Sequence, residues 1–348
     1  MLPVCSLTVC GVYARSLVST GTTADSMLLE VVVAVVVVVV SLRTWYVYTS
    51  GRCTSTRSMA GKTVIITGGT AGIGKETARD LLWRSARVVL ACRNLEKGAR
   101  VAGELRAEVG SVGEVVVRRL DTSDLTSVRT FAKEVLDTEK AIHVLINNAG
   151  RASPEKREVT EDGLEMTMAT NHFGHFLLTN LLLGRLKESA PSRVVNVSSM
   201  GHRWASKFDV NDLTLSSPYD PPQAYFISKL CNVLFTRELA DRLAGTGVTA
   251  NSLHPGAVNT NILNSLSFSF TSALFSLFLI VFGKDAALGA QTSIHLAVSE
   301  EVEGLTGIYF GDCKEEVPSK LARRKDLATA LWEASVKAVG LQPHETHC

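Results

Sequence analysis

A tyrosine and a lysine four residues apart, Tyr225 and Lys229, have the types and spacing needed to exchange a proton with a substrate. The apolar residues after them recur at helical spacing, at Leu230, Val233, Leu234 and Leu239. On a helix, positions i and i+4 share a face and lie about 6 Å apart. A cation at that distance favours the phenolate of a tyrosine whose ordinary pKa is about 10. The pair fits acid–base chemistry on an alcohol and its carbonyl, although the same spacing also occurs on solvated helix faces.

A glycine-rich turn upstream predicts a dinucleotide site. It follows the apolar run 64–66 and precedes a helical pattern, which is the context that such a fingerprint requires. Gly68 allows a tight turn, Gly72 lets the backbone approach a pyrophosphate, and Gly74 lets helix and strand pack closely. The helix N-terminus then faces the phosphates. The turn expected to contact the cofactor consists of Gly68, Gly69, Thr70, Ala71, Gly72, Ile73 and Gly74.

The end of the next apolar strand, residues 87–93, indicates which nucleotide is preferred. An NAD site normally has a carboxylate there, which accepts from the ribose 2′-hydroxyl. This chain has Arg93 instead, and its first acidic residue is Glu96. Since a guanidinium pairs with a 2′-phosphate, the sequence favours NADP(H), with a solvated loop arginine as the alternative.

Polar residues and glycines also follow four later apolar runs. They are Asp121 after 115–117, Asn147, Asn148 and Gly150 after 143–146, Ser198 and Ser199 after 193–197, and Pro255 and Gly256 after 248–253. The carboxyl ends of parallel strands meet at one edge of a sheet, where ligands bind in open α/β folds. We therefore expect these residues beside the glycine turn.

Strands and helices alternate from Gly61 to Leu253. This alternation predicts an α/β fold, a Rossmann-type doubly wound parallel sheet with helices on both faces. We expect one catalytic domain with an N-terminal membrane anchor. The expected segments are an extension at 1–26, an anchor helix at 27–48, a linker at 49–60, the catalytic domain at 61–341 and a tail at 342–348.

Composition narrows the classes of partner. A formal net charge of +2, from 36 basic and 34 acidic residues, gives no basis for nucleic-acid binding. The seven cysteines form no CxxC pair, which is typical of reduced thiols in a domain that faces the cytosol. Cys92 and Cys231 are expected to be small core residues. No metal is expected, because His172 and His175 have no evident third ligand and fit core positions better.

The apolar segment near the N-terminus predicts a membrane anchor. The uninterrupted run 31–42 is shorter than the roughly 20 residues that span a bilayer. Residues 27–48 suffice if Glu30 and Arg43 reach the interfaces, and the aromatic residues at 45–48 suit an interfacial belt. Most nearby basic residues follow the run, which predicts a catalytic domain in the cytosol. A cleaved signal peptide is the alternative, although no small-residue cleavage site is evident.

The motifs together resemble the short-chain dehydrogenase/reductase superfamily. In order they are TGxxxGIG at 67–74, NNAG at 147–150, a strand-end serine, YxxxK and a Pro-Gly turn. Further stretches resemble its membrane-bound, NADP-preferring retinol dehydrogenases, at 53–56, 72–78, 90–94, 174–179 and 190–193. The resemblance covers about residues 50–341.

The resemblance implies a catalytic tetrad. Tyr225 would be the acid/base, and Lys229 would lower its pKa and hold the nicotinamide ribose. Ser199 would bind the substrate oxygen, and Asn171 would place a water of the proton relay. The implied cofactor contacts are the 68–74 turn, Arg93, Asp121, Asn148, Tyr225, Lys229, Pro255 and Gly256.

Two positions depart from the pattern of the resembled family. Arg151 follows NNAG, where relatives usually carry apolar residues near the nicotinamide, so it either faces solvent or alters substrate preference. Ala71 stands where some NADP-specific members carry a basic residue, which leaves more of the selection to Arg93.

A second apolar stretch, 266–282, lies between the Pro-Gly turn and a predicted helix near 286–298. In the resembled fold this insertion covers the substrate pocket. We interpret it as an apolar lid that dips into the membrane and admits a lipid-like substrate. A core helix under the sheet and a second transmembrane helix are the alternatives.

The implied function is an NADP(H)-dependent oxidoreductase that interconverts an apolar alcohol and its aldehyde or ketone. Retinol and retinal are the first choice, with reduction favoured by the cellular NADPH/NADP ratio. The implied location is the endoplasmic reticulum membrane, crossed once. The alternatives are the same chemistry on a steroid, polyprenol or lipid aldehyde, and a binding protein on an inactive fold, which the complete tetrad disfavours.

Overall fold

The computed structural model describes residues 24–206, 208–216, 218–258 and 281–347. The chain divides into two compact units, with the boundary between Thr49 and Ser50. In the first unit, helix α2 runs from Ala24 to Thr49. Its segment Met27–Thr49 has 23 residues, a mean hydropathy of 2.4 and no burial inside the protein. At about 1.5 Å per residue, this length matches the hydrocarbon core of a bilayer.

The second unit is built on an eight-stranded sheet with the order β3-β2-β1-β4-β5-β6-β7-β8. The strands are β1 Thr63–Thr67, β2 Arg87–Cys92, β3 Glu114–Arg119, β4 Val144–Asn147, β5 Ser192–Val197, β6 Val248–His254, β7 Tyr309–Gly311 and β8 Lys314–Glu315. Every neighbouring pair is parallel except β7 and β8. The predicted doubly wound parallel sheet is confirmed. Its strand order reverses between β1 and β4, where cofactors bind in such folds.

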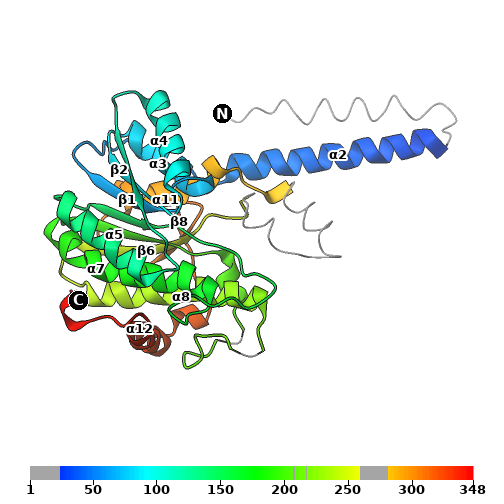
Figure 1. Cartoon of the computed structure of the whole chain (residues 1–348). Coiled ribbons are helices and arrows are strands. Elements are labelled where there is room, and N and C mark those ends of the chain that lie inside the picture. The colour runs from blue at the N-terminus through cyan, green and yellow to red at the C-terminus, as the bar shows by residue number, and fades with distance from the viewer. Residues whose placement is uncertain (1–23, 207, 217, 259–280, 348) are drawn as a thin grey trace. The chain divides into compact units, whose positions relative to one another are not determined.

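Helices cover both faces of this sheet (Figure 1). One layer contains α3 Gly72–Trp83, α4 Leu95–Val109 and α11 Ala286–Val298, and the other contains α5 Leu125–Thr138, α7 Gly174–Glu188, α8 Pro221–Arg242 and α12 Lys325–Val339. Successive residues of β1 pack against opposite helix layers, because Ile65 belongs to one buried cluster while Val64 and Ile66 belong to the other. The strands read as continuous apolar runs because both faces are covered.

Short elements complete the second unit. They are α6 Met166–Met168, the π-helical η1 Ala169–Phe173, η2 Met200–Trp204, η3 Glu300–Val302, η4 Leu321–Arg323 and η5 Pro343–Glu345. α6, η1 and α7 follow one another without a break. A π-helical turn inside a longer helix is uncommon and often marks a functional site.

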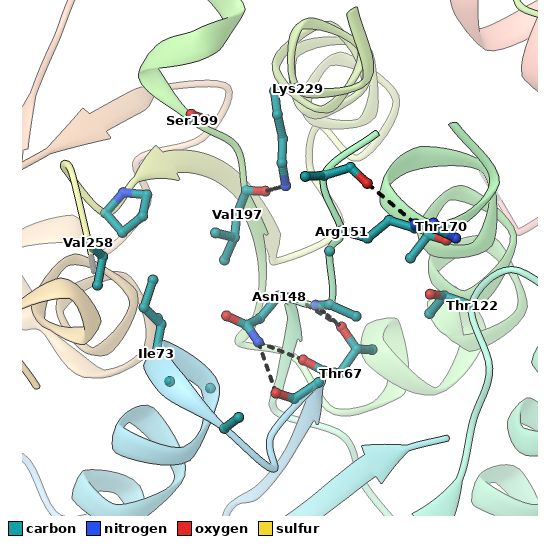
Figure 2. Close-up of a pocket in the computed structure, with 18 of the residues that line it drawn as sticks. Thr67, Ile73, Thr122, Asn148, Arg151, Thr170, Val197, Ser199, Lys229 and Val258 are labelled. Atoms are coloured by element: carbon teal, nitrogen blue, oxygen red, sulfur yellow. Dashed lines mark hydrogen bonds between the residues drawn. The ribbon is translucent and has the colours of Figure 1, made fainter. Parts of the chain in front are cut away.

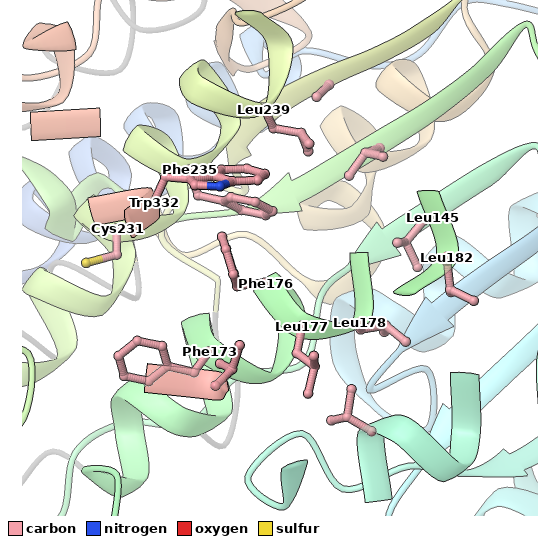
Figure 3. Packing of buried hydrophobic residues seen from close by; sticks show 14 of the residues in the cluster. Leu145, Phe173, Phe176, Leu177, Leu178, Leu182, Cys231, Phe235, Leu239 and Trp332 are labelled. Carbon is pink, nitrogen blue, oxygen red and sulfur yellow. The ribbon is translucent and has the colours of Figure 1, made fainter. Parts of the chain in front are cut away.

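Three aromatic rings join α7, α8 and α12 (Figure 3). The ring centroid of Phe176 lies 5.3 Å from that of Phe235 and 4.9 Å from that of Trp332, and the last two lie 5.8 Å apart. These separations are typical of favourable aromatic pairs. The cluster holds α8, which carries Tyr225 and Lys229, firmly against its neighbours.

Two segments expected to be peripheral pack onto the second unit. Met59, within the expected linker at 49–60, is 4% exposed and belongs to the core beneath α3 and α4. In the expected tail at 342–348, Glu345 pairs with Arg129 at 2.9 Å. The compact unit therefore includes the linker from Ser50 onward and the tail. Several contacts with distant residues hold the linker, among them the Cys53 N–H with the Gln291 side chain at 3.0 Å and the Arg84 guanidinium with the Ser55 carbonyl at 2.8 Å, and local composition does not report such contacts.

Candidate active site

A cavity of about 1010 Å³ opens at the carboxyl ends of β1, β2, β4, β5 and β6. Figure 2 shows lining residues from several of these elements, with Thr67, Asn148 and Val197 among those labelled. Most of the predicted site residues line the cavity: Gly68, Thr70, Ala71, Gly72, Ile73, Gly74, Arg93, Asp121, Asn148, Ser199, Tyr225, Lys229, Pro255 and Gly256. Two do not. Gly69 packs behind the turn, where a Cβ would lie 2.7 Å from Leu90, and Asn171 is fully buried.

The glycine turn forms a cradle that larger residues would fill. Gly68 has a φ of +68°, and a Cβ on it would lie 2.9 Å from the Ala149 Cα. A Cβ on Gly74 would lie 2.5 Å from the Gly68 carbonyl oxygen. α3 starts at this turn, and Ala71 at its N-cap offers no side-chain acceptor, whereas α4 and α5 are capped by side chains. The first N–H groups of α3 thus remain available to an anion, which fits the pyrophosphate of a dinucleotide.

A buried hydrogen-bond network centred on Thr67 supports this cradle. The Thr67 Oγ1 accepts from the backbone N–H groups of Asn148 and Ala149, each at 2.9 Å, and lies 2.9 Å from the His175 Nε2. Burial lowers the pKa of His175 to about 4, so the ring is neutral at physiological pH. The His175 Nδ1 lies 3.1 Å from the Asn171 carbonyl oxygen. One tautomer satisfies all partners, with Nδ1 donating to that carbonyl and Nε2 accepting from the threonine hydroxyl.

Asn148 closes the same network from the other side. Its amide donates to the Thr67 carbonyl oxygen at 2.8 Å, as the dashed lines in Figure 2 show. The end of β1, the loop after β4 and η1 are therefore tied together. Sequence reasoning missed Thr67 and assigned His175 only a core position, which is confirmed. A threonine at the strand end before the glycine turn was the available signal.

Asn171 lies in η1 and holds a loop in place. Its side-chain oxygen accepts from the Arg151 N–H at 2.8 Å, and its amide donates to the Arg151 carbonyl at 3.0 Å and to the Ser228 hydroxyl at 2.9 Å. The side chain thereby joins the loop after NNAG to α8. The structure gives it this bracing contact rather than a place on the cavity wall.

Arg151 itself lines the cavity but does not point at Lys229. Its guanidinium pairs with Glu158 at 3.0 Å, and Figure 2 shows the side chain extending toward Thr170. The departure from the resembled family is therefore accommodated by an ion pair at the edge of the cavity. The Arg151 backbone contacts the predicted tetrad, because its N–H donates to the Asn171 side-chain oxygen.

Tyr225 and Lys229 share the cavity face of α8, as their spacing predicts. The Lys229 Nζ lies 5.8 Å from the centre of the Tyr225 ring and donates to the Val197 carbonyl at 3.1 Å (Figure 2). Burial lowers the pKa of Lys229 to about 8, so the ammonium still predominates near pH 7. Gly150 leaves room for it, since a Cβ there would lie 3.3 Å from the Nζ.

The pKa of Tyr225 is raised, which is opposite to the direction expected from a neighbouring cation. Burial of the phenol is the main cause, and a hydrogen bond with the Ser199 hydroxyl offsets it in part. The ammonium of Lys229 contacts the Val197 carbonyl rather than the phenol oxygen, so desolvation dominates. Tyr225 is therefore protonated at neutral pH and is prepared to donate a proton.

The two serines after β5 have different partners. The Ser198 hydroxyl donates to the Lys229 carbonyl at 2.7 Å and is buried. Ser199 precedes η2, and its oxygen accepts from the Gly201 N–H at 3.0 Å. Of these two serines, Ser199 is the one that hydrogen-bonds Tyr225, and its contact with the substrate oxygen stays a prediction.

The cavity rim at the end of β2 is basic. The Arg93 side chain is 75% exposed, and its Nη1 lies 3.9 Å from the Asp121 Oδ2. Lys97 and Asn94 line the same rim, and sequence reasoning named neither. An exposed pair at this distance is weak, so the guanidinium remains available to an anionic group.

The opposite end of the cavity, beyond Ser199 and Tyr225, is apolar. It is lined by Met200, Trp204, Pro222 and Phe226, none of which the motifs identified. Phe226 follows the tetrad tyrosine directly, and Trp204 ends η2, so position next to the predicted catalytic residues was the available signal. The expected lid at 266–282 lies almost wholly outside the described residues, which resume at Val281.

Known proteins resemble this chain in sequence over most of its length. The sequence model of short chain dehydrogenases matches residues 62–268. Retinol dehydrogenase 12 of Mus musculus is 49% identical over 297 residues, which cover 85% of this chain and 92% of the relative. Retinol dehydrogenase 11 of Homo sapiens is 49% identical over 294 residues, covering 84% and 90%. Retinol dehydrogenase 14 of Homo sapiens is 48% identical over 296 residues, covering 81% and 88%.

Solved structures share the fold. An uncharacterized protein from Mycobacterium paratuberculosis has a TM-score of 0.67 and 36% identity, over 84% of this chain and 98% of that one. The RhlG/NADP active-site complex from Pseudomonas aeruginosa has a TM-score of 0.59 and 24% identity, over 76% and 98%. The second likeness concerns the fold alone.

Proposed function

This chain belongs to the short-chain dehydrogenase family and is a nicotinamide-dependent oxidoreductase, and from that premise we propose that it reduces retinal to retinol with NADPH. The observation that carries the proposal is the continuity of the cavity. One space joins the glycine cradle and basic rim to Tyr225, Ser199 and an apolar end. A dinucleotide and an apolar carbonyl compound can therefore meet at the phenol.

In this proposal the chain's residues bind and protonate the substrate oxygen. A bound nicotinamide supplies the hydride for the carbonyl carbon. Tyr225 donates its proton to the oxygen, and the Ser199 hydroxyl hydrogen-bonds the same atom. The raised pKa of Tyr225 suits this direction, because reduction needs the protonated phenol whereas oxidation needs the phenolate.

Lys229 and Asn171 support the tyrosine in this proposal. An ammonium has three donors, and the Val197 carbonyl takes one of them among the described residues. The others suit the ribose hydroxyls of the cofactor. Asn171 positions the loop of Arg151 against α8, and we propose that a water beside Lys229 continues the proton path there.

Retinoid specificity rests on two supports. Relatives nearly half identical over most of their length carry the name retinol dehydrogenase. The substrate end of the cavity is apolar and presents Trp204 and Phe226. The test is a panel of aldehydes with NADPH and microsomes containing the full chain. We expect retinal to give the highest kcat/KM, and a steroid ketone or polyprenal outperforming retinal would refute the assignment.

Replacing Arg93 with aspartate is expected to shift preference from NADPH toward NADH. The change removes a cation that can pair with the 2′-phosphate and adds a carboxylate suited to a 2′-hydroxyl. We expect the NADPH/NADH ratio of kcat/KM to fall roughly tenfold or more, in keeping with the loss of one charge-assisted contact. The control is Arg100→Asp, on the exposed side of α4 and outside the cavity. An unchanged ratio in the first variant would show that other residues select the cofactor.

We propose that the chain associates with membranes through α2 and crosses the endoplasmic reticulum membrane once, with the catalytic unit in the cytosol. The basic residues that follow α2, Arg52 and Arg57 among them, favour this orientation. Residues 27–48 would form the anchor, and the compact unit that begins at Ser50 would be the catalytic domain.

A chain that starts at Ser50 is expected to leave the carbonate-resistant membrane fraction. It lacks α2, while the whole compact unit from Ser50 is retained. Immunoblots of pellet and supernatant measure the change. In sealed microsomes, the catalytic unit of the full chain should be open to added protease. Protection until detergent is added would reverse the orientation, and a mature protein beginning near residue 50 would support a cleaved signal instead.

A further inference from the structure

We propose that Trp204, Phe226 and Tyr225 form an aromatic path that selects conjugated, flat aldehydes over saturated ones. This inference rests on the proposed function and concerns the substrate class of the same site. It assigns specificity to Trp204 and Phe226, while the proton chemistry stays with Tyr225. The path runs from the cavity rim at the end of η2 to the phenol on α8.

The three rings follow one another at contact spacing. The centroids of Trp204 and Phe226 lie 5.6 Å apart, and those of Phe226 and Tyr225 lie 6.2 Å apart. The interplanar angles are 58° and 65°. All three side chains line the same cavity. A substrate whose carbonyl reaches Tyr225 and Ser199 therefore extends along Phe226 toward Trp204.

Trp204 is exposed although hydrogen bonds hold the backbone around it in place. The residue is 59% exposed, but its carbonyl accepts from the Gln223 Nε2 at 3.0 Å. The Gln223 Oε1 in turn accepts from the Ser206 N–H at 2.9 Å. Gln223 thus ties the end of η2, from the Trp204 carbonyl to the Ser206 N–H, to the start of α8. An indole held at a cavity rim with its apolar surface exposed suits contact with a bound apolar ligand.

A glycine makes the close approach of η2 to Phe226 possible. A Cβ on Gly201 would lie 2.8 Å from the Phe226 Cδ1 and 3.3 Å from the Ser199 Oγ. With glycine there, the η2 backbone packs directly against the Phe226 ring and beside Ser199. The ring spacings then place Phe226 next to both Trp204 and Tyr225.

Ring faces discriminate by shape and polarisability. A conjugated polyene is flat and offers π density along its length, so it can contact the faces or edges of successive rings. A saturated chain of the same length is flexible and loses rotamer freedom when it is straightened along the path. The structure therefore points to conjugation, beyond general apolarity, as the property that this cavity recognises.

The test uses two aldehydes of equal length, 2,4-decadienal and decanal, together with retinal. For the full chain in microsomes with NADPH, we expect a preference in kcat/KM for the dienal over decanal. Trp204→Ala should lower that preference roughly tenfold by raising the KM of the dienal, which corresponds to the loss of one aromatic contact. Trp204→Phe should retain most of it. Trp83→Ala is the matched control, because Trp83 is 51% exposed on α3 and does not line the cavity.

The outcomes separate this inference from the proposed function. An equal rise of KM for dienal and decanal in Trp204→Ala would reduce Trp204 to a general apolar contact and overturn the proposal. Unchanged KM values with weaker binding to liposomes of neutral phospholipid would make Trp204 a membrane contact, which also overturns it. If the unmodified chain reduces the dienal but not retinal, the retinoid assignment fails while the aromatic path stands on the dienal ratio.

Discussion

Tyr225→Phe is expected to lower the turnover of aldehyde reduction at least about 100-fold while NADPH still binds. The substitution removes the hydroxyl that would protonate the substrate oxygen and keeps the ring, which packs beside Phe226. The Ser199 hydroxyl remains, and its oxygen accepts from the Gly201 N–H. Among the described residues no acid stands behind Ser199 to replace a proton that it would give to the substrate. Steady-state turnover with retinal and NADPH fluorescence titration measure the two quantities separately.

Tyr219→Phe is the matched control for this loss. The Tyr219 hydroxyl lies 3.3 Å from Glu165, does not line the cavity, and has its pKa raised to about 12 chiefly by burial. Its removal should leave turnover within about threefold, as for a polar contact away from the reacting atoms. Near-normal turnover in Tyr225→Phe, with the control also active, would show that another group donates the proton.

The sheet, and the placement of Tyr225 and Lys229 on one helix face, were predictable because local pattern and global fold agree. The strands read as apolar runs because helices cover both faces, and each run ends in residues that the parallel arrangement brings to one edge. The i,i+4 spacing of Tyr225 and Lys229 survives in α8 with nearly the predicted separation. The positions of residues that depend on spacing along a single helix or strand could therefore be predicted.

Features that depend on contacts between distant segments were not predictable. The contact of Thr67 with His175 joins residues 108 positions apart, and no local pattern in the sequence pairs the two. The π-helical turn at 169–173, which carries Asn171, has no strong signal in residue type. The direction of the Tyr225 pKa depends on how much water the fold removes, and helical spacing does not report that. Trp204 reaches the cavity only because η2 folds back toward Phe226.

Lys229→Met is expected to lower turnover by about 100-fold and to change its dependence on pH. Methionine keeps much of the apolar stem but removes the ammonium that donates to Val197 and faces the Tyr225 ring. The pKa of Lys229 is lowered to about 8, so the free enzyme loses this charge as the pH rises through that value. The kcat/KM for reduction should therefore fall above about pH 8 in the unmodified chain, because kcat/KM reports groups of the free enzyme.

In Lys229→Met that decline should disappear, leaving a lower and flatter profile across the same range. Lys75→Met is the control, since Lys75 pairs with Glu104 at 2.6 Å on the surface and lines no part of the cavity. The control should keep both the rate and the decline above pH 8. The raised pKa of Tyr225 places its own titration above this range, so the decline can be assigned to the lysine. A Lys229→Met enzyme that retains the decline would locate the titrating group elsewhere, and the ammonium would then be needed for cofactor binding rather than for proton transfer.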